Sequence, residues 1–389
     1  MKRICIVTGS RAEYGLLKPI MKKLVQTKRY DVRIVVTGAH LSPRFGSTYR
    51  EILDDGFVID AQIDILQSGD APSDITKSMA KAMSGFADYF EKKLPDLLIV
   101  LGDRYESLAV CCAAMNQRIP IAHLHGGETT QGAIDESIRH CITKMSHLHF
   151  TSTREYARRV VQLGEQPKSV HCVGAIGVEN ILAEELLSKP ELEKELGMQL
   201  KKPYAVVTFH PVTLEADEKG MQMRELLKAV STFEDMQFVF TKANADANGI
   251  IINDLLDSHA KKHTNAAVFD SLGVKRYLST LKYAKMVIGN SSSGLLEAPS
   301  FGIPTVNIGD RQKGRLKADS VINCAPNAAA IEEAVNKACS SDFLQIARKS
   351  TNPYGSGGTS DKVIGHINAF LDKESIDLKK KFYDLEFDN

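Results

Sequence analysis

Short apolar segments, each ending in glycine and polar residues, recur along this chain of 389 residues with helical patterns between them. The first such segment, Ile4–Val7, runs into Gly9-Ser10-Arg11, and leucines at helical spacing follow it. Uninterrupted apolar runs of this length are typical of strands buried in a parallel sheet. Their strict alternation with helices predicts an α/β fold built on doubly wound parallel sheets.

The alternation occurs twice, which predicts two domains. A single hydrophobic core stops growing near roughly 250–300 residues, and the apolar strands pause in a charged helical stretch at 179–200 before they restart at Ala205. We expect Rossmann-like domains at 1–175 and 176–360 that face a central cleft, where one ligand can contact both. The last helix and the tail, 361–389, are expected to pack back on the first domain.

Charge and cysteine usage narrow the class of partner. The formal net charge of +1 gives no bulk attraction to nucleic acid or to an anionic membrane, so neither is expected as a partner. The seven cysteines form no C-x-x-C pair, which is typical of reduced thiols in a cytoplasmic protein. The apolar run near the N-terminus is too short for a signal peptide, and no run is long enough for a membrane span.

The densest group of titratable side chains lies at 121–140, where an apolar strand ends at Gly126-Gly127 and a helix follows. Ligands of open α/β sheets bind at the carboxyl ends of the strands. This position therefore indicates a site that includes His123, His125, Glu128, Asp135 and Arg139. A polar surface loop before a capped helix is the alternative. Further polar groups follow other strands, notably Asp103, Arg104, His210 and the loop 244–248.

A phosphate site is predicted at Gly289–Gly294, which reads G-N-S-S-S-G after a strand and before a helix expected from about Leu295. Small residues let backbone N–H groups approach a ligand, and a helix N-terminus favours phosphate. Glu297 is placed to accept a hydrogen bond from a sugar hydroxyl. Arg11 and Arg311, each close behind a glycine, offer bidentate contacts with phosphate. A capped helix and two surface arginines are the alternatives.

Several cofactor motifs are absent. The sequence has no G-x-G-x-x-G, no P-loop and no G-x-S-x-G, which disfavours NAD, FAD and serine hydrolase chemistry. His123 and His125 with Glu128 offer metal ligands, but no further ligand follows at a diagnostic spacing, so no metal or other cofactor is expected. The second pair, His147 and His149, is interpreted as packing or interface residues.

Seven motifs in combination resemble the hydrolysing UDP-N-acetylglucosamine 2-epimerases of bacterial sialic acid capsule synthesis. They are Thr8-Gly-Ser-Arg-Ala-Glu-Tyr-Gly15, Gly102-Asp-Arg104, His125-Gly-Gly-Glu128, Ile134-Asp-Glu-Ser-Ile-Arg-His140, His210-Pro211, Gly289-Asn-Ser-Ser-Ser-Gly294 and Gly309-Asp-Arg-Gln-Lys-Gly-Arg315. The resemblance runs from about residue 3 to 372. It implies the two-domain fold called GT-B and a reaction that converts UDP-N-acetylglucosamine (UDP-GlcNAc) and water to N-acetylmannosamine (ManNAc) and UDP.

The resemblance also implies roles for single residues. Asp103, Asp135 and His210 match the family's catalytic positions. The residues that match its UDP contacts are Arg11, Arg311, Ser291, Ser292 and Glu297, and Arg104 and Asn244 are expected to bind the substrate as well. Many members carry a catalytic glutamate where this chain has His125, so either His125 or the nearby Glu128 is expected to act as the second acid or base.

Alternatives of several classes remain open on the sequence. The same mechanism on a UDP-2,4-diacetamido-2,4,6-trideoxy sugar, as in legionaminic acid synthesis, is the first of them. A non-hydrolysing epimerase, a GT-B glycosyltransferase and a non-catalytic nucleotide-sugar sensor are the others. The resemblance further implies a homodimer or homotetramer.

Overall fold

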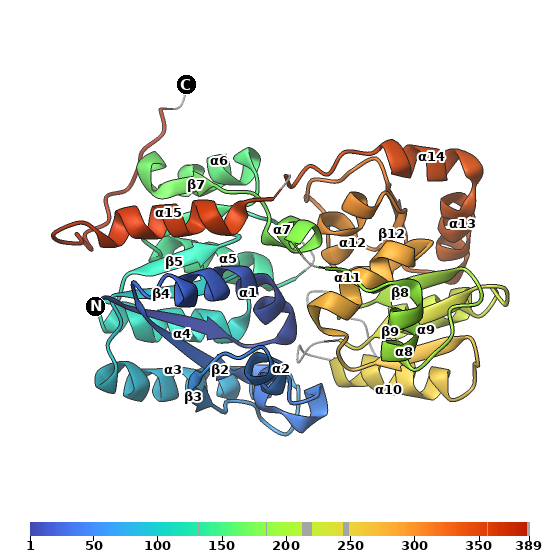
Figure 1. Cartoon of the computed structure of the whole chain (residues 1–389), viewed down its shortest axis with the longest axis horizontal. Helices are drawn as coiled ribbons and strands as arrows, with labels where there is room; N and C mark the ends of the chain where they lie inside the picture. Colours follow the sequence, from blue (N-terminus) through green and yellow to red (C-terminus); the bar gives the residue numbers. More distant parts are fainter. Residues whose placement is uncertain (131–132, 184, 212–219, 244–248, 356, 387–389) are drawn as a thin grey trace. The chain divides into compact units, whose positions relative to one another are not determined.

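The computed structural model describes the chain except residues 131–132, 184, 212–219, 244–248, 356 and 387–389. It divides into two compact units (Figure 1). Unit 1 comprises 1–128, 135–179 and 354–389, and unit 2 comprises 129–134 and 180–353. The boundaries thus fall after residues 179 and 353 rather than after 175 and 360, and the short segment 129–134 belongs to unit 2.

Unit 1 is built on a seven-stranded parallel sheet in the order β3-β2-β1-β4-β5-β6-β7. Its strands are β1 (Arg3–Thr8), β2 (Asp31–Thr37), β3 (Ile59–Ile63), β4 (Leu97–Leu101), β5 (Ile121–Leu124), β6 (Leu148–Thr151) and β7 (Val170–Cys172). Its helices are α1 (Arg11–Gln26), α2 (Tyr49–Asp54), α3 (Pro72–Lys92), α4 (Tyr105–Asn116), α5 (Asp135–Met145), α6 (Arg154–Gln162) and α15 (Thr359–Leu371), and α7 (Ile176–Ala183) crosses the boundary.

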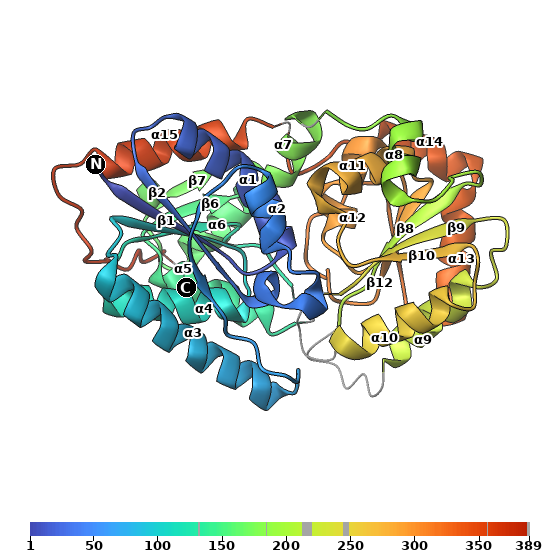
Figure 2. The same ribbon diagram turned by 60° about the horizontal axis from the view of Figure 1, so that its bottom comes forward.

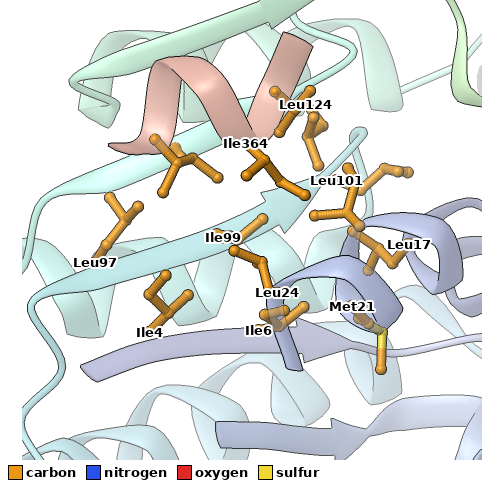
Figure 3. Close-up of a cluster of buried hydrophobic side chains, with 14 of the residues drawn as sticks. Ile4, Ile6, Leu17, Met21, Leu24, Leu97, Ile99, Leu101, Leu124 and Ile364 are labelled. Atoms are coloured by element: carbon orange, nitrogen blue, oxygen red, sulfur yellow. The ribbon is translucent and has the colours of Figure 1, made fainter. Parts of the chain in front are cut away.

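Both faces of this sheet are covered by helices, which explains why its central strands are apolar throughout. On one face, Leu17, Met21 and Leu24 of α1 pack with strand residues such as Ile6 and Ile99 (Figure 3). The last helix, α15, joins the same core through Val363, Ile364, Ile367, Phe370 and Leu371. Helices α3, α4 and α5 cover the opposite face.

Unit 2 repeats the design with a six-stranded parallel sheet in the order β10-β9-β8-β11-β12-β13. Its strands are β8 (Tyr204–Thr208), β9 (Gln237–Thr241), β10 (Ala266–Phe269), β11 (Met286–Gly289), β12 (Thr305–Ile308) and β13 (Val321–Cys324). Its helices are α8 (Lys189–Leu196), α9 (Met221–Val230), α10 (Gly249–Ala260), α11 (Gly273–Tyr283), α12 (Ser293–Leu296), α13 (Ala328–Cys339) and α14 (Ser341–Lys349). Residues of α9, α10, α13 and α14 pack on one face, and residues of α8 and α11 pack on the other (Figure 2).

The predicted α/β fold with two doubly wound parallel sheets is therefore confirmed. In each sheet the strand order reverses once, between β1 and β4 in unit 1 and between β8 and β11 in unit 2. Ligands of such sheets bind at the carboxyl ends of the strands flanking this point. Across the described part of the chain, no helix has both the length and the apolar character that a membrane span requires.

Candidate functional site

The carboxyl ends of β4 and β5 in unit 1 present an ion-paired cluster centred on Arg139. This arginine lies on α5, is almost fully buried, and forms an ion pair with Asp103, which follows β4. It also pairs with Glu136 at 3.3 Å and donates from Nη1 to the backbone carbonyl of Glu128 at 2.9 Å. The guanidinium therefore fixes the orientation of Asp103 relative to the turn that follows β5.

The sequence-predicted carboxylates Asp103 and Asp135 both lie at the start of a helix. The N-cap of α4 is Arg104, without a capping side chain, and Asp103 precedes it. Asp135 is the first residue of α5, one turn before Arg139. Both carboxylates thus lie at the same edge of unit 1 as Arg139.

His123 is a structural part of this edge. Its Nε2 donates to the carbonyl of Gly102 at 2.7 Å, so Nδ1 accepts from Thr143 Oγ1 at 3.2 Å. Burial lowers the pKa of His123 to about 3, which keeps the imidazole neutral near pH 7. His123 therefore supports the backbone next to Asp103. Within the described residues, no group of three or more His, Cys, Asp or Glu side chains is arranged to hold a metal ion.

His125 and Glu128 are brought together by the glycine turn after β5. Nδ1 of His125 lies 3.5 Å from Oε1 of Glu128, and Ser152 donates to that oxygen at 2.7 Å. His125 has a φ of 65°, which is uncommon for a residue with a Cβ and is found at functional sites. Gly127 has a φ of 75°, and a Cβ there would lie 2.3 Å from the carbonyl oxygen of Tyr156, so the turn requires glycine. The turn thus places the imidazole of His125 beside the carboxylate of Glu128.

The carboxyl ends of β1 and β4 hold a second carboxylate cluster. Arg104 donates from Nε to Glu106 at 2.5 Å, and both side chains are buried. Glu13, on the first turn of α1, accepts from the Gly9 backbone N–H at 2.8 Å and from the hydroxyl of Ser10 at 3.2 Å. Burial, and then the charge of Glu106, raise the pKa of Glu13 to about 7.

Glu13, Glu106 and Glu136 were not predicted as site residues from the sequence. Glu13 lies three residues after the N-cap Ser10, which is the spacing of a capping box and masks any other role. Glu106 lies two residues after the predicted Arg104. The other predicted residue here, Arg11, is the first residue of α1 and is half-buried.

In unit 2 the corresponding strand ends are joined by Asn290. The backbone N–H of His210 donates to Asn290 Oδ1 at 2.7 Å, and Asn290 Nδ2 donates back to the His210 carbonyl at 2.8 Å. The carbonyl of Asn290 accepts from Gln312 at 2.8 Å and from Arg311 at 3.2 Å. Predicted residues His210 and Arg311 are thus tied to the end of β11 through Asn290.

The predicted phosphate loop differs from its expectation in one respect. The helix that follows it, α12, contains only four residues, so its dipole adds little to anion binding. Ser291, Ser292 and Glu297 are half-buried at this turn, and Ser293 is hydrogen-bonded to the hydroxyl of Tyr277. Hydroxyl and backbone groups therefore remain as the loop's donors. Asn244 lies outside the described residues.

Comparison with known proteins identifies a matching family and several similar proteins. A family model described as UDP-N-acetylglucosamine 2-epimerase matches residues 22–368. The chain is 43% identical to a Campylobacter jejuni GDP/UDP-N,N'-diacetylbacillosamine 2-epimerase (hydrolysing), with 99% of each chain covered. It is 41% identical to the polysialic acid biosynthesis protein P7 of Escherichia coli, over 99% of this chain and 98% of that protein.

A Staphylococcus aureus protein, MnaA, solved with UDP, has the same fold. Its TM-score is 0.80 at 18% sequence identity, with 99% of this chain and 100% of that chain covered. The extent of the family match and the two relatives above 40% identity together decide the assignment. The chain belongs to the UDP-N-acetylglucosamine 2-epimerase family.

Proposed function

We propose that the protein is a hydrolysing 2-epimerase that releases a C2-epimerised 2-acetamido sugar from its UDP conjugate. The observation that carries the proposal is the acid–base cluster of Asp103, Arg139, His125 and Glu128 in a member of this family. A sensor that only binds a nucleotide sugar has no need of oriented carboxylates beside an imidazole. The family match and the hydrolysing relative support the same chemistry.

The proposed reaction has two steps. In the first, a base removes the C2 proton, the C1–O bond breaks, and UDP leaves with the bonding electron pair, which gives the 2-acetamidoglucal. In the second, an acid returns a proton to the opposite face of C2, the oxygen of water bonds to C1, and the water gives up one proton to a base. Both steps need groups that exchange protons near neutral pH, and the first needs donors for the departing diphosphate.

The assignments follow from this chemistry. Asp103 and Asp135 are proposed as catalytic carboxylates, and the His125–Glu128 pair as the second acid or base. His210 is proposed as the catalytic histidine of unit 2, acting as an acid or base. Substrate contacts are proposed for three arginines, Arg11, Arg104 and Arg311. They are also proposed for Ser291, Ser292 and Glu297 of the loop after β11, and for Asn244, which lies outside the described residues. No step is assigned to a metal or a redox cofactor, because elimination and hydration are proton chemistry.

Two substrates compete. UDP-GlcNAc, giving ManNAc for sialic acid synthesis, is our first assignment, and the 41% identity to a polysialic acid biosynthesis protein supports it. A UDP-2,4-diacetamido-2,4,6-trideoxy sugar is the second, and it is favoured by the 43% identity to the diacetylbacillosamine 2-epimerase. Both share the carbons that react, C1 and C2, and they differ at C4 and C6.

A proton NMR time course with each UDP-sugar in turn tests the proposal. We expect UDP and a free C2-epimerised sugar from one of the two. A UDP-linked epimer would instead mean a non-hydrolysing enzyme, and UDP binding without turnover of either sugar would favour the sensor. Transfer of the sugar to an added acceptor, with C2 unchanged, would favour a glycosyltransferase.

Variants separate binding from catalysis. We expect Asp103→Asn to bind UDP normally and to lose turnover, whereas Asp88→Asn, an exposed aspartate on α3, should leave both unchanged. Arg311→Ala should weaken UDP binding, and Arg348→Ala, at an exposed position of α14, is its control. Equal turnover in Asp103→Asn and the wild type would contradict the catalytic assignment. The proposed homodimer or homotetramer is checked by light scattering on the same samples.

A further inference from the structure

Asn290 connects three strand ends of unit 2 through different parts of one residue. Its side-chain amide bonds both backbone groups of His210, after β8, at 2.7 and 2.8 Å. Its backbone carbonyl accepts from Gln312 and Arg311, after β12, at 2.8 and 3.2 Å. The side chain of Asn290 is fully buried, so water does not compete for these bonds.

The preceding glycine explains how Asn290 reaches His210. Gly289 pairs with Thr208 in the register of β11 and β8 and has a φ of 135°. A Cβ on Gly289 would lie 1.9 Å from the Thr208 carbonyl oxygen, so only glycine permits this approach. The N–H of Asn290 then donates to the same carbonyl at 3.2 Å. The strand ends of β8 and β11 are thus held closer than side chains would allow.

The paired hydrogen bonds restrict His210 in a specific way. An amide offers one acceptor and a donor in a fixed plane, so it matches the N–H and C=O of a single residue. Both bonds must break before the backbone of His210 can rotate. The contacts with Gln312 and Arg311 use the Asn290 carbonyl, which any residue at this position would supply. Substitution of the side chain therefore affects the His210 connection first.

We propose that Asn290 is a positioning residue for His210, which it holds in the geometry needed for turnover while the UDP-binding groups stay in place. This inference rests on the proposed function, in which His210 takes part in catalysis. Asn290 itself is not assigned contact with the reacting atoms. Its effect passes through the backbone of His210.

Kinetics of two substitutions test the role. Asn290→Ala removes both hydrogen bonds, and Asn290→Asp keeps the acceptor but places an oxygen against the His210 carbonyl. We expect kcat to fall by about a hundredfold in both, because small misplacements of catalytic groups cost about that much. The dissociation constant of UDP should stay unchanged. The control is Asn307→Asp on β12, an equally buried amide whose side chain bonds Asn323.

Hydrogen exchange gives a readout that does not depend on activity. The amide of His210 donates to the Asn290 side chain, so its exchange should become faster in Asn290→Ala than in the wild type and in Asn307→Asp. Faster exchange of His210 with lost kcat and retained UDP affinity supports the proposal. A parallel loss of UDP affinity and kcat, or unchanged exchange, overturns it. If the wild type turns over no UDP-sugar, the proposed function fails, whereas the exchange result still decides whether Asn290 orders His210.

Discussion

Replacement of Arg139 by methionine is the sharpest test of the cluster in unit 1. The substitution keeps an unbranched side chain but removes the charge that pairs with Asp103 and Glu136 and the donor to the Glu128 carbonyl. Asp103 and Glu136 then both lose the guanidinium with which they pair. Removal of one partner from a buried ion pair costs about 3–5 kcal/mol. Because the Asp103 and Glu136 side chains are 21% and 26% exposed, water compensates in part.

We therefore expect the free energy of unfolding of unit 1 to fall by about 3 kcal/mol. For a unit of about 200 residues this corresponds to a melting temperature lower by about 6–12 °C. Differential scanning calorimetry measures it, with the two units fitted as separate transitions. Turnover should fall about a hundredfold in the same variant, because Asp103 loses its orientation.

The control is Arg158→Met on the exposed face of α6, which should change the free energy of unfolding by less than about 0.5 kcal/mol. Arg139→Lys keeps the charge but not the planar set of donors, and it should fall between the two. If Arg139→Met has the same melting temperature as Arg158→Met, the guanidinium does not anchor the cluster, and the argument for an oriented Asp103 fails.

Two further predictions concern a carboxyl and a glycine. The pKa of Glu13 is about 7, above its value in the unfolded chain, so the wild type should lose stability as pH rises from about 4.5 to 7. Glu13→Gln should lack this loss, and at pH 8 it should unfold at a higher urea concentration than the wild type. The control, Glu91→Gln at an exposed position of α3, should behave like the wild type. An unchanged pH slope in Glu13→Gln would contradict the shifted pKa. Gly289→Ala should destabilise unit 2 by about 3 kcal/mol, from backbone strain and the contact with Thr208. Gly365→Ala in α15, with open space around the new methyl, should be neutral or stabilising; equal effects of the two would contradict the close approach.

Much of the fold follows from local patterns. The central strands β1, β4 and β8 are apolar runs that end in polar turns, because they are buried on both faces. Two of the strands at sheet edges were harder to predict. β3, with the sequence I-D-A-Q-I, is half-buried and lacks the apolar run, and β13 is similar. Neither was predicted, since an edge strand needs only one neighbour and tolerates polar residues.

The charged stretch at 179–200 shows another limit. It was interpreted as one helix, whereas α7 ends at Ala183 and α8 begins at Lys189. Ser188 and Glu191 form a capping box that starts the second helix. The Ser-x-x-Glu pattern in the sequence indicates the start of this second helix.

The candidate site also has a part that local patterns predict and a part that they do not. The strand ends that carry Asp103, His125 and His210 could be predicted, because polar residues after apolar strands mark the carboxyl edge of a sheet. The pairing of Asp103 with Arg139 joins residues 36 positions apart in the numbering, and that of His210 with Asn290 joins residues 80 apart. Such contacts depend on strand order, which no local pattern specifies.

The most direct test of the central claim is to run the reaction in D₂O and to analyse C2 of the released sugar by proton NMR and mass spectrometry. Elimination and hydration predict a free sugar of inverted configuration at C2, with one deuterium on that carbon and UDP as the other product. A released sugar that keeps its original C2 configuration and its C2 proton would mean simple hydrolysis at C1. That result would contradict the proposed role of Asp103 and of the His125–Glu128 pair.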